Sequence, residues 1–361
     1  RSRQGAFDQP HIAYTSCSAM FRNLLVMDGK NKTGPFPRQQ LAGMIKSGVV
    51  DKKTPAWRAG LNDWTGGSVV NVGGSLTLEP GTTSGTFSAV FNLDDFGDGD
   101  TIVTGTHYVS RDMTVGTNNV QLYAGDLLLS VDTTENLDGG LTVDDRDIFI
   151  FRPTEAGDYS AGTLTLLFDG NDIGLGTLTA FTLVEHDTTV GDVTLSAGEL
   201  LLAHGGSTKN IFRFEPGTLG ATTGGTLTML LNGGDIDIGQ NIAALDLVER
   251  DITLGDTTLT SGQLLVSLAG DDSAVGDAPT IVTQRFDVFA LDVTATGDGT
   301  GAATATLVFD GSDVNLNDNG TENISGVSIY QRDYTPTIDD AGFSLDENSA
   351  NATVVGTVSA S

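Results

Sequence analysis

Cysteine is nearly absent from this chain of 361 residues, since Cys17 is the only one. An internal disulfide is therefore excluded, and stability must come from packing or from bound metal. No run of 18 or more apolar residues occurs, so the sequence predicts no membrane span. It has no initiator methionine and no signal peptide, and it stops within a pattern, so we expect a fragment of a longer protein.

The motifs of common enzyme classes are also missing. There is no Gly-x-Ser-x-Gly, no phosphate-binding loop and no Gly-x-Gly-x-x-Gly after a strand. His107 and His204 have no partner at metal-ligand spacing. His186 stands between Glu185 and Asp187, but arginine takes its place in the equivalent segments, so we expect a variable, exposed position. The sequence thus favours a non-enzymatic protein.

Lysine becomes scarce after the first part of the chain, where Lys209 is the only one beyond Lys53. Residues 1–67 hold ten basic and four acidic residues, and the rest of the chain holds eight and 43. This change marks a domain boundary near residues 64–70. The acidic part would repel nucleic acid and anionic lipid and could attract divalent cations, so we expect no nucleic-acid partner.

One strand-and-turn pattern occurs four times. In residues 301–314, small or polar residues alternate with apolar ones and run into a Phe-Asp-Gly turn. Similar segments lie at 162–173 and 225–236, and a weaker one lies at 85–95. Alternation with period two is typical of a β-strand with one buried face. Its repetition predicts a fold of similar units.

Each repeat holds further landmarks in a fixed order: an aliphatic triplet, an aromatic strand, the strand and turn, and a last strand that ends in aspartate. The triplets are residues 127–129, 200–202 and 264–266, and the aromatic strands are 147–151, 210–214 and 286–291. The last strands are 107–112, 183–187, 247–251 and 328–333. Their closing aspartates are 75, 64 and 82 residues apart. We predict units of about four strands at 68–112 (partial), 113–187, 188–251 and 252–333.

Four-stranded units whose narrow apolar faces must stack on their neighbours are typical of a β-propeller. The repeats resemble the propeller-like units of large bacterial surface proteins. We therefore predict a mainly β fold with a propeller-like repeat region over residues 68–333. Either the strand at 328–333 completes the first unit, or the ring is incomplete. A row of β-sandwich or prism-like modules would fit the same alternation.

Residues 21–67 form a separate predicted domain, and residues 1–20 are expected to be unstructured or a linker. The pattern predicts a strand at 24–26 and a helix within 40–48. The segment 21–65 resembles the bacterial variant of the GYF domain, a small α+β fold. The matching residues are Asp28-Gly29, Gly34-Pro35-Phe36, Leu41, Ile45-Lys46-Ser47-Gly48, Ala56-Trp57-Arg58-Ala59-Gly60 and Asp63-Trp64.

The GYF resemblance implies a peptide-binding surface. Eukaryotic members bind proline-rich peptides on aromatic side chains, which here would be Phe36, Trp57 and Trp64. The alternative is that the two tryptophans form the core of a very small domain.

The last segment, 334–361, resembles the start of a cadherin-type repeat, a β-sandwich that is truncated here. Pro336, Phe343, Glu347-Asn348 and residues 354–358 carry the resemblance. It implies Ca²⁺ ligands at Glu347 and Asp333.

Acidic loops predict further Ca²⁺ ligands, because this cation takes several oxygen ligands. Asp94, Asp98 and Asp100 form the densest loop, and Asp313 begins another that lacks the glycine and glutamate of an EF-hand. Solvated turns are the alternative. Aspartates recur at the turn of each repeat, which favours turn capping over catalysis: Asp169, Asp172, Asp235, Asp310 and Asp313.

Together these patterns predict a non-enzymatic fragment of a cell-surface or secreted protein. Its loops would serve adhesion or contact with protein or carbohydrate, with Ca²⁺ as cofactor, and the repeat region would be extracellular. One alternative is a propeller-type carbohydrate-active enzyme, which predicts a non-repeating cluster of carboxylates or histidines. Another is a peptide-binding adaptor that acts through the GYF-like domain.

Overall fold

The chain divides into two compact units, Arg1–Gln331 and Arg332–Ser361. The computed structural model describes residues 89–97, 101–254, 257–314, 316 and 323–330, and before them the backbone of seven short strands and the side chain of Thr83. The predicted cadherin-like start at 334–361 lies outside the described residues. Within the described part the fold is mainly β, and its helices are short 3-10 turns.

Sixteen strands pair into four antiparallel sheets of four strands each. Sheet 1 contains, in order, β31 (Ile324–Ile329), β1 (Ile12–Ser16), β5 (Val69–Val72) and β8 (Ala89–Asn92). Sheet 2 contains β9 (Val103–Tyr108), β12 (Leu127–Val131), β15 (Ile148–Glu155) and β16 (Asp158–Phe168). Sheet 3 contains β17 (Leu178–Leu183), β20 (Leu200–His204), β21 (Ile211–Thr218) and β22 (Gly224–Leu231). Sheet 4 contains β23 (Ile242–Leu247), β26 (Leu264–Leu268), β29 (Val288–Ala295) and β30 (Ala302–Phe309).

Hairpins and 3-10 turns join these strands. Hairpins after the first strands are β10 (Met113–Val115) with β11 (Val120–Leu122), β18 (Thr188–Val190) with β19 (Val193–Leu195), and β24 (Ile252–Leu254) with β25 (Thr257–Leu259). Others are β6 (Thr77–Glu79) with β7 (Thr82–Ser84), β13 (Glu135–Leu137) with β14 (Leu141–Val143), and β27 (Asp272–Val275) with β28 (Ile281–Thr283). The turns are η1 (Leu93–Asp95), η2 (Asp138–Gly140), η3 (Gly170–Ile173), η4 (Gly233–Ile236) and η5 (Gly311–Val314).

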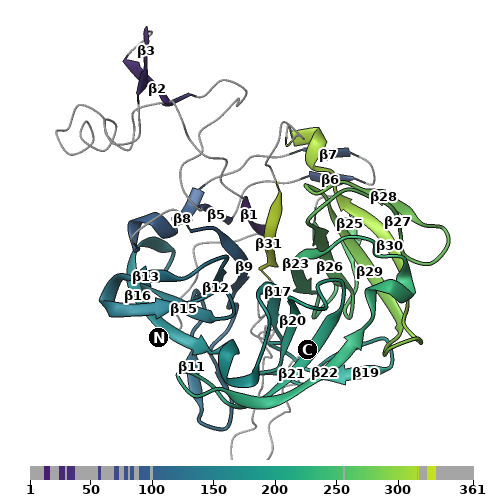
Figure 1. Ribbon diagram of the computed structural model, residues 1–361. Coiled ribbons are helices and arrows are strands. Elements are labelled where there is room, and N and C mark those ends of the chain that lie inside the picture. The colour runs from purple at the N-terminus through teal and green to yellow at the C-terminus, as the bar shows by residue number, and fades with distance from the viewer. Residues whose placement is uncertain are drawn as a thin grey trace, which may run out of the picture. The chain divides into compact units, whose positions relative to one another are not determined.

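The first strands of the four sheets contact one another in a cyclic order: β9 with β17, β17 with β23, β23 with β31, and β31 with β9. Figure 1 shows these four strands side by side at the centre of the sheets, with the later strands of each sheet farther out. Sheet 1 joins distant parts of the chain, because β31 pairs with β1 in an antiparallel register that sets Ile12 opposite Ile329.

Two sequence predictions need correction at this point. The segment 1–20, expected to be unstructured or a linker, contains β1, which pairs with both β31 and β5. A strand of five residues is too short to show a clear alternation of polar and apolar residues in the sequence. The last strand of each predicted unit is in fact the first strand of the next sheet, since β17 pairs with β20 and β23 with β26. Strand order along the chain does not say which neighbour a strand pairs with.

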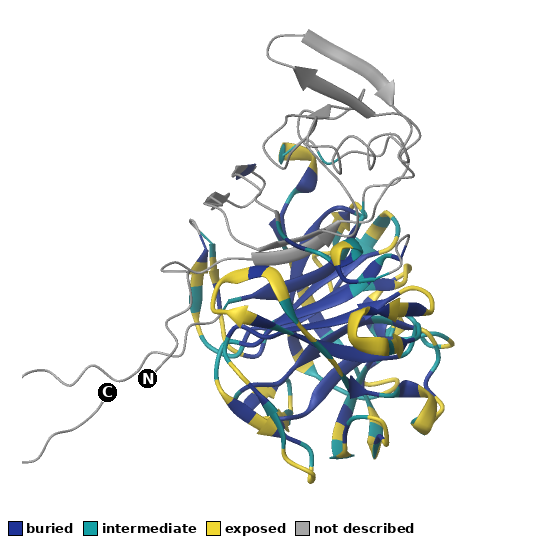
Figure 2. Ribbon diagram, turned by 90° about the vertical axis from the view of Figure 1, so that its left-hand side faces the viewer, coloured by how far each residue is buried: buried dark blue, intermediate teal, exposed yellow. Residues whose placement is uncertain are grey.

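The core lies where the sheets face one another. The aliphatic triplets fall in the second strands β12, β20 and β26, and all nine side chains are at most 1% exposed. The second strand of each sheet is covered on both faces, so side chains that point to either face are buried. Its sequence is therefore a continuous apolar run and does not alternate between polar and apolar residues. Figure 2 shows the buried residues concentrated on the inner strands, with exposed residues at the outer strands and turns.

The glycine that begins η3, η4 and η5 is required by a close backbone approach. A Cβ on Gly233 would lie 2.1 Å from the carbonyl oxygen of Lys209, and one on Gly311 would lie 2.2 Å from that of Phe286. The Gly233 amide donates to Asn210 Oδ1 at 3.1 Å, and the Gly311 amide to Asp287 Oδ1 at 3.0 Å. The turn is thus fixed against the start of the aromatic strand.

A separate three-stranded sheet lies within the GYF-like segment. It has the order β3 (Asn31–Phe36), β2 (Leu24–Asp28) and β4 (Ala56–Trp57). The strand predicted at 24–26 is confirmed as part of β2. The helix predicted within 40–48 lies outside the described residues.

Candidate functional site

The same position of the four central strands holds a polar residue. It is His107 in β9, Thr182 in β17, Asp246 in β23 and Ser328 in β31, and all four side chains are buried. The residues that follow them on the strands are apolar or tyrosine. A buried polar group must find a hydrogen-bond partner, and here the partners come from the neighbouring central strands.

His107 lies at the centre of this group. Its Nδ1 is 2.9 Å from Thr182 Oγ1, and the Thr182 hydroxyl donates to Asp246 Oδ1 at 2.7 Å. On the other side of the ring, Nε2 is 3.1 Å from Glu185 Oε1. Backbone amides complete the group, since Tyr108 N donates to Ser328 Oγ at 3.0 Å and Ile329 N to Asp246 Oδ2 at 2.5 Å. The four strands are thus tied by side chains as well as by packing.

The charge state of His107 follows from its two carboxylate neighbours. Burial alone would favour the neutral ring, but hydrogen bonds and attraction to Asp246 and Glu185 prevail and raise the pKa of His107 from 6.5 to about 9. A protonated ring has two N–H donors, one for Thr182 and one for Glu185. The buried imidazolium is therefore balanced by carboxylates from two other sheets.

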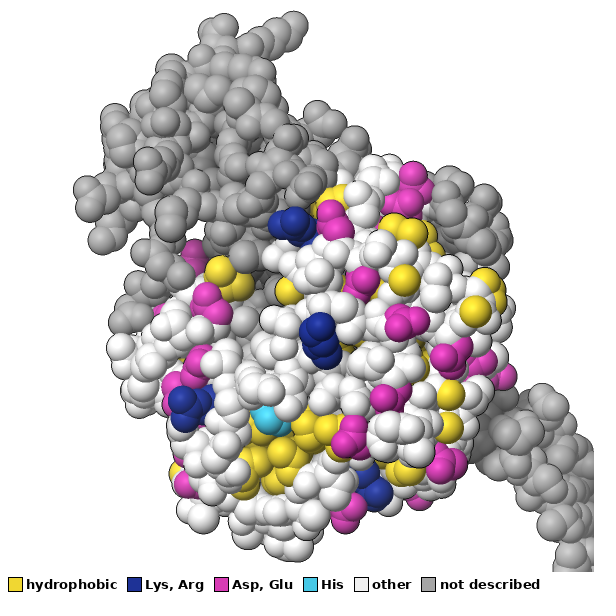
Figure 3. All heavy atoms as spheres, turned by 45° about the vertical axis from the view of Figure 1, so that its right-hand side comes forward, with side chains coloured by type: hydrophobic (Ala, Val, Ile, Leu, Met, Phe, Trp, Pro, Cys, Tyr) yellow, Lys and Arg dark blue, Asp and Glu magenta, His cyan; other side chains and the backbone are white. Residues whose placement is uncertain are grey.

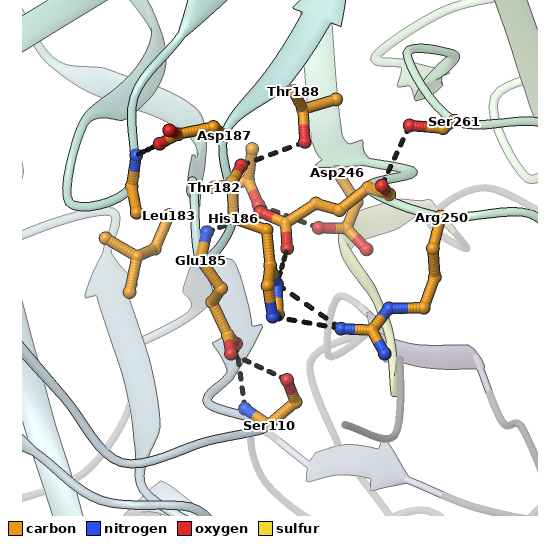
Figure 4. Close-up of polar contacts among 12 residues, drawn as sticks. Ser110, Thr182, Leu183, Glu185, His186, Asp187, Thr188, Asp246, Arg250 and Ser261 are labelled. Atoms are coloured by element: carbon orange, nitrogen blue, oxygen red, sulfur yellow. Dashed lines mark hydrogen bonds and ion pairs between the residues drawn. The ribbon is translucent and has the colours of Figure 1, made fainter. Parts of the chain in front are cut away.

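Two glutamates that follow the central strands, Glu185 after β17 and Glu249 after β23, form a second layer of carboxylates. Ser110 donates through both its backbone amide and its hydroxyl to Glu185, at 2.8 and 2.6 Å. The backbone amide of Glu185 in turn donates to Glu249 Oε1. Figure 4 shows Glu185 directed toward Ser110. Each carboxylate thus binds the backbone of the adjacent sheet.

The expected exposed position at His186 is partly buried, with 26% of its side chain accessible. Its Nδ1 lies 2.8 Å from Glu249 Oε2, and its Nε2 lies 3.0 Å from Arg250 Nη2. Figure 4 shows Arg250 directed toward the His186 ring. Because the guanidinium only donates, Nε2 accepts and Nδ1 carries the hydrogen. Burial raises the pKa of Glu249, although the hydrogen bond from His186 opposes this.

The arrangement is not that of a hydrolytic triad. Nucleophile activation needs a hydroxyl bonded to a base, which a third group orients. Here the carboxylate of Glu185 lies between Ser110 and His107, so the serine hydroxyl faces an acceptor that is already bonded to the histidine. The hydrogen bonds of the cluster link the central strands of different sheets. The histidine–carboxylate pairing was missed from the sequence because 78 residues separate its members.

Two of the repeated turn aspartates, Asp169 and Asp310, cap their own turns, and the other three accept hydrogen bonds from the backbone of other segments: Asp172, Asp235 and Asp313. Asp169 accepts from the Asn171 amide at 3.0 Å within its own turn. Asp172 of sheet 2 accepts from the amide of Thr223 in the segment that leads into β22 of sheet 3, at 2.7 Å, and Asp313 of η5 accepts from the amide of Thr83 in β7, at 2.6 Å. Such hydrogen bonds to a charged acceptor contribute about 1.5–3 kcal/mol each.

Two of the six predicted metal ligands lie among the described residues. Asp94 is half-buried in η1, and Asp313 binds Thr83. The other four, Asp98, Asp100, Asp333 and Glu347, lie outside the described residues. Among the described residues, no three His, Cys, Asp or Glu side chains gather closely enough to hold a metal ion.

Replacement of Asp313 by alanine is expected to lower the free energy of unfolding by about 2 kcal/mol, because the buried Thr83 amide loses a charged acceptor. Asp158→Ala removes an exposed carboxylate whose hydrogen bonds to Ser160 stay within one strand, and it should cost less than about 0.5 kcal/mol. Urea unfolding in Ca²⁺ and in EDTA measures both variants. A loss for Asp313→Ala that occurs only in Ca²⁺ would mean that this side chain binds metal instead.

The predicted peptide-binding residues lie in the three-stranded sheet as far as it is described. Phe36 of β3 pairs with Leu24 of β2, and Trp57 of β4 pairs with Leu25. Trp64 lies outside the described residues. Residues 25–70 match the family model described as GYF domain 2. This match confirms the resemblance seen over 21–65, and it covers a small part of the chain.

Domains of the GYF family are modules that bind proline-rich peptides. The matched segment begins after β1 and ends in β5, so it connects two strands that are neighbours in sheet 1. Neither curated proteins nor solved structures give a match to the chain. None of the helices in the described part has the length and hydropathy of a membrane-spanning segment.

Proposed function

We propose that this chain is a non-enzymatic interaction protein. In this proposal a four-bladed, propeller-like scaffold carries a domain of the GYF type that binds proline-rich peptides. The observation that carries it is the family match over residues 25–70, a segment that connects the paired strands β1 and β5. An insertion between adjacent strands is held at both of its ends, which suits a recognition module on a rigid support.

The propeller-like arrangement is supported by the strand order. Each of the four sheets begins with a central strand, and the central strands contact one another cyclically. Sheet 1 takes its first strand from the end of the region and its other three from the beginning, which is a common means of closing a ring of blades. The polar group around His107 would then surround the ring axis.

Peptide binding can be tested by fluorescence, because the two tryptophans of the chain both lie in the matched segment. We expect a synthetic proline-rich peptide to shift their emission on titration into the full chain. Trp57→Ala should weaken binding by about 2 kcal/mol, or roughly 30-fold in Kd, if Trp57 is an aromatic anchor. The control peptide has its prolines replaced by alanine.

Equal binding of both peptides would reject the proposal. So would an unchanged Kd for a Trp57→Ala variant whose circular dichroism matches that of the parent. A loss of fold in that variant would favour the alternative that Trp57 is a core residue, and Phe36→Ala then tests the same surface.

Ring closure can be tested by a disulfide. Ala13 and Ser328 are opposite each other in the β1–β31 register, within the distance that a disulfide spans. With Cys17→Ser, we expect the pair Ala13→Cys and Ser328→Cys to cross-link within one chain under mild oxidation. The control pair, Ala13→Cys and Ser325→Cys, is displaced by about 10 Å along the strand and should not cross-link. Equal cross-linking of both pairs would contradict the register.

Calcium binding and adhesion at a cell surface remain predictions. The acidic repeat region and the absence of disulfides motivated them, and the residues that would carry the metal include Asp98, Asp100 and Glu347, outside the described part. Calorimetric titration of the full chain with Ca²⁺ would detect such sites. For the carbohydrate-active alternative, Glu185 is the informative position: its replacement by glutamine would abolish turnover of a sugar substrate if the cluster were catalytic.

A further inference from the structure

Sheets 2, 3 and 4 hold equivalent apolar positions that can be compared directly through their strand registers. In each sheet the last residue of the second strand is opposite the start of the first strand. An aromatic residue of the third strand is opposite the last residue of the aliphatic triplet. In sheet 2 these residues are Val131 and Phe149, and both are 0% exposed. In sheet 4 they are Leu268 and Phe289, also 0% exposed.

Sheet 3 differs at both positions. His204 and Phe212 occupy them, and both are half-buried. Met229, which is opposite Phe212 on β22, is half-buried, as are its counterparts Leu166 and Leu307 opposite Phe149 and Phe289. The His204 ring lies on that of Phe212, with centroids 4.7 Å apart. Sheet 3 therefore leaves the ring of Phe212 partly accessible, where the two comparable sheets bury the rings of Phe149 and Phe289.

The cause is a missing cover. Between the second and third strands, sheet 2 has the hairpin β13–β14, whose Leu137 and Val143 join the core cluster that contains Phe149. Sheet 4 has the hairpin β27–β28, whose Val275 joins the cluster of Phe289. In sheet 3 the connection is only residues 205–210 and contains no strand.

The backbone hydrogen bonds of the covering hairpins show the same difference between the sheets. The Asp138 amide of the first covering hairpin donates to the carbonyl oxygen of Phe96 at 2.7 Å, and the Gly276 amide of the second donates to that of Ile236 at 2.8 Å. Each of these carbonyls belongs to the 3-10 turn region of the preceding sheet. Ile173 ends the equivalent turn of sheet 2, and among the described residues no hairpin amide bonds to its carbonyl oxygen.

Two polar groups beside the surface add to its chemistry. His204 Nδ1 is 2.9 Å from the Gly205 carbonyl and must donate to it, while Nε2 is buried and has no hydrogen-bond partner in the described part. Lys209 is exposed in the short connection and is the single lysine of residues 54–361. Figure 3 shows hydrophobic side chains gathered beside a histidine on one face of the molecule.

We propose that the face of sheet 3 formed by His204, Phe212 and Met229 is a docking site for an extended or hairpin segment of another protein. The chemistry of the occupant follows from the chain's own hairpins: aliphatic side chains against Phe212 and Met229, and a backbone amide for the Ile173 carbonyl. Acidic side chains suit Lys209, as both covering hairpins carry aspartate, at Asp138 and Asp277. A second copy is disfavoured, because its hairpins already cover sheets 2 and 4.

The test uses a cyclised peptide that copies residues 133–144, TTENLDGGLTVD, and a scrambled peptide of the same composition. We expect the native-sequence peptide to bind the full chain, raise its melting temperature and shift the Met229 methyl resonance. Met229→Glu should weaken binding at least tenfold. Thr228→Glu, at the adjacent exposed position of β22, should leave it unchanged.

A graft gives an independent readout. Replacement of residues 205–209 by the hairpin sequence should raise the melting temperature and abolish peptide binding, because the new hairpin covers the site. The proposal is overturned if neither peptide binds and the graft does not stabilise the chain. It is also overturned if the chain forms a dimer in analytical ultracentrifugation that Met229→Glu dissociates, because a second copy would then be the occupant.

Discussion

Replacing Gly233 with alanine is expected to lower the free energy of unfolding by about 3 kcal/mol, near the upper end of the cost of overpacking a fixed site. The added Cβ would lie 2.1 Å from the carbonyl oxygen of Lys209, far inside van der Waals contact. That oxygen belongs to backbone held next to Asn210, which also binds the Gly233 amide. Neither η4 nor the segment before β21 can move away without breaking the hydrogen bond between Gly233 and Asn210.

The neighbouring glycine provides the matched control. A Cβ on Gly234 would meet only Asn232 Oδ1, at 3.2 Å, which is the end of a flexible side chain. Gly234→Ala should therefore change stability by less than about 1 kcal/mol, since alanine also restricts the unfolded chain. Urea unfolding of both variants gives the comparison. Similar losses for the two would show that turn flexibility, and not the close approach, requires glycine here.

The protein is expected to lose about 3 kcal/mol of stability as the pH rises from about 6.5 to above 9, through deprotonation of His107. The pKa of His107 is raised from 6.5 to about 9 in the folded chain. Because the folded protein binds this proton more tightly than the unfolded chain, the contribution is full below pH 6.5 and disappears as the pH passes 9. Glu185 and Asp246 then remain buried without the balancing charge.

Other groups also titrate in this range, so the effect must be isolated by a difference. The stability gap between the parent and His107→Asn should shrink by about 3 kcal/mol between pH 6 and pH 10. Thr114→Ala, at an exposed position without a titratable group, is the control, and its gap should stay constant. If His107→Asn does not fold, NMR titration of the four histidines of the parent decides the matter. All four rings losing their proton below pH 7.5 would contradict the assignment.

Several features of the fold could be predicted from the sequence because they depend on local pattern. The repeated pattern predicted a strand that runs into a turn, and β16, β22 and β30 each do so. The aliphatic triplets recur as continuous apolar runs in the sequence, and each is buried. The GYF-like segment could be recognised from short motifs that the family match confirms.

The polar group around His107 could have been found by a better alignment of the repeats. His107, Thr182, Asp246 and Ser328 each stand five residues before a closing aspartate. A polar residue that recurs at one position of otherwise apolar strands indicates a shared site. In each strand taken alone, however, the alternation of polar and apolar residues predicts that this residue is exposed at the surface. Only the convergence of four sheets buries it.

The sequence by itself determined the strands, their turns and the composition of the interior, because alternation and turn chemistry act over a few residues. The tertiary structure alone decided that β1 pairs with β31, that Glu185 neutralises His107, and that sheet 3 lacks the cover of its neighbours. These depend on contacts between residues far apart in the chain, and such contacts form only when the sheets pack together.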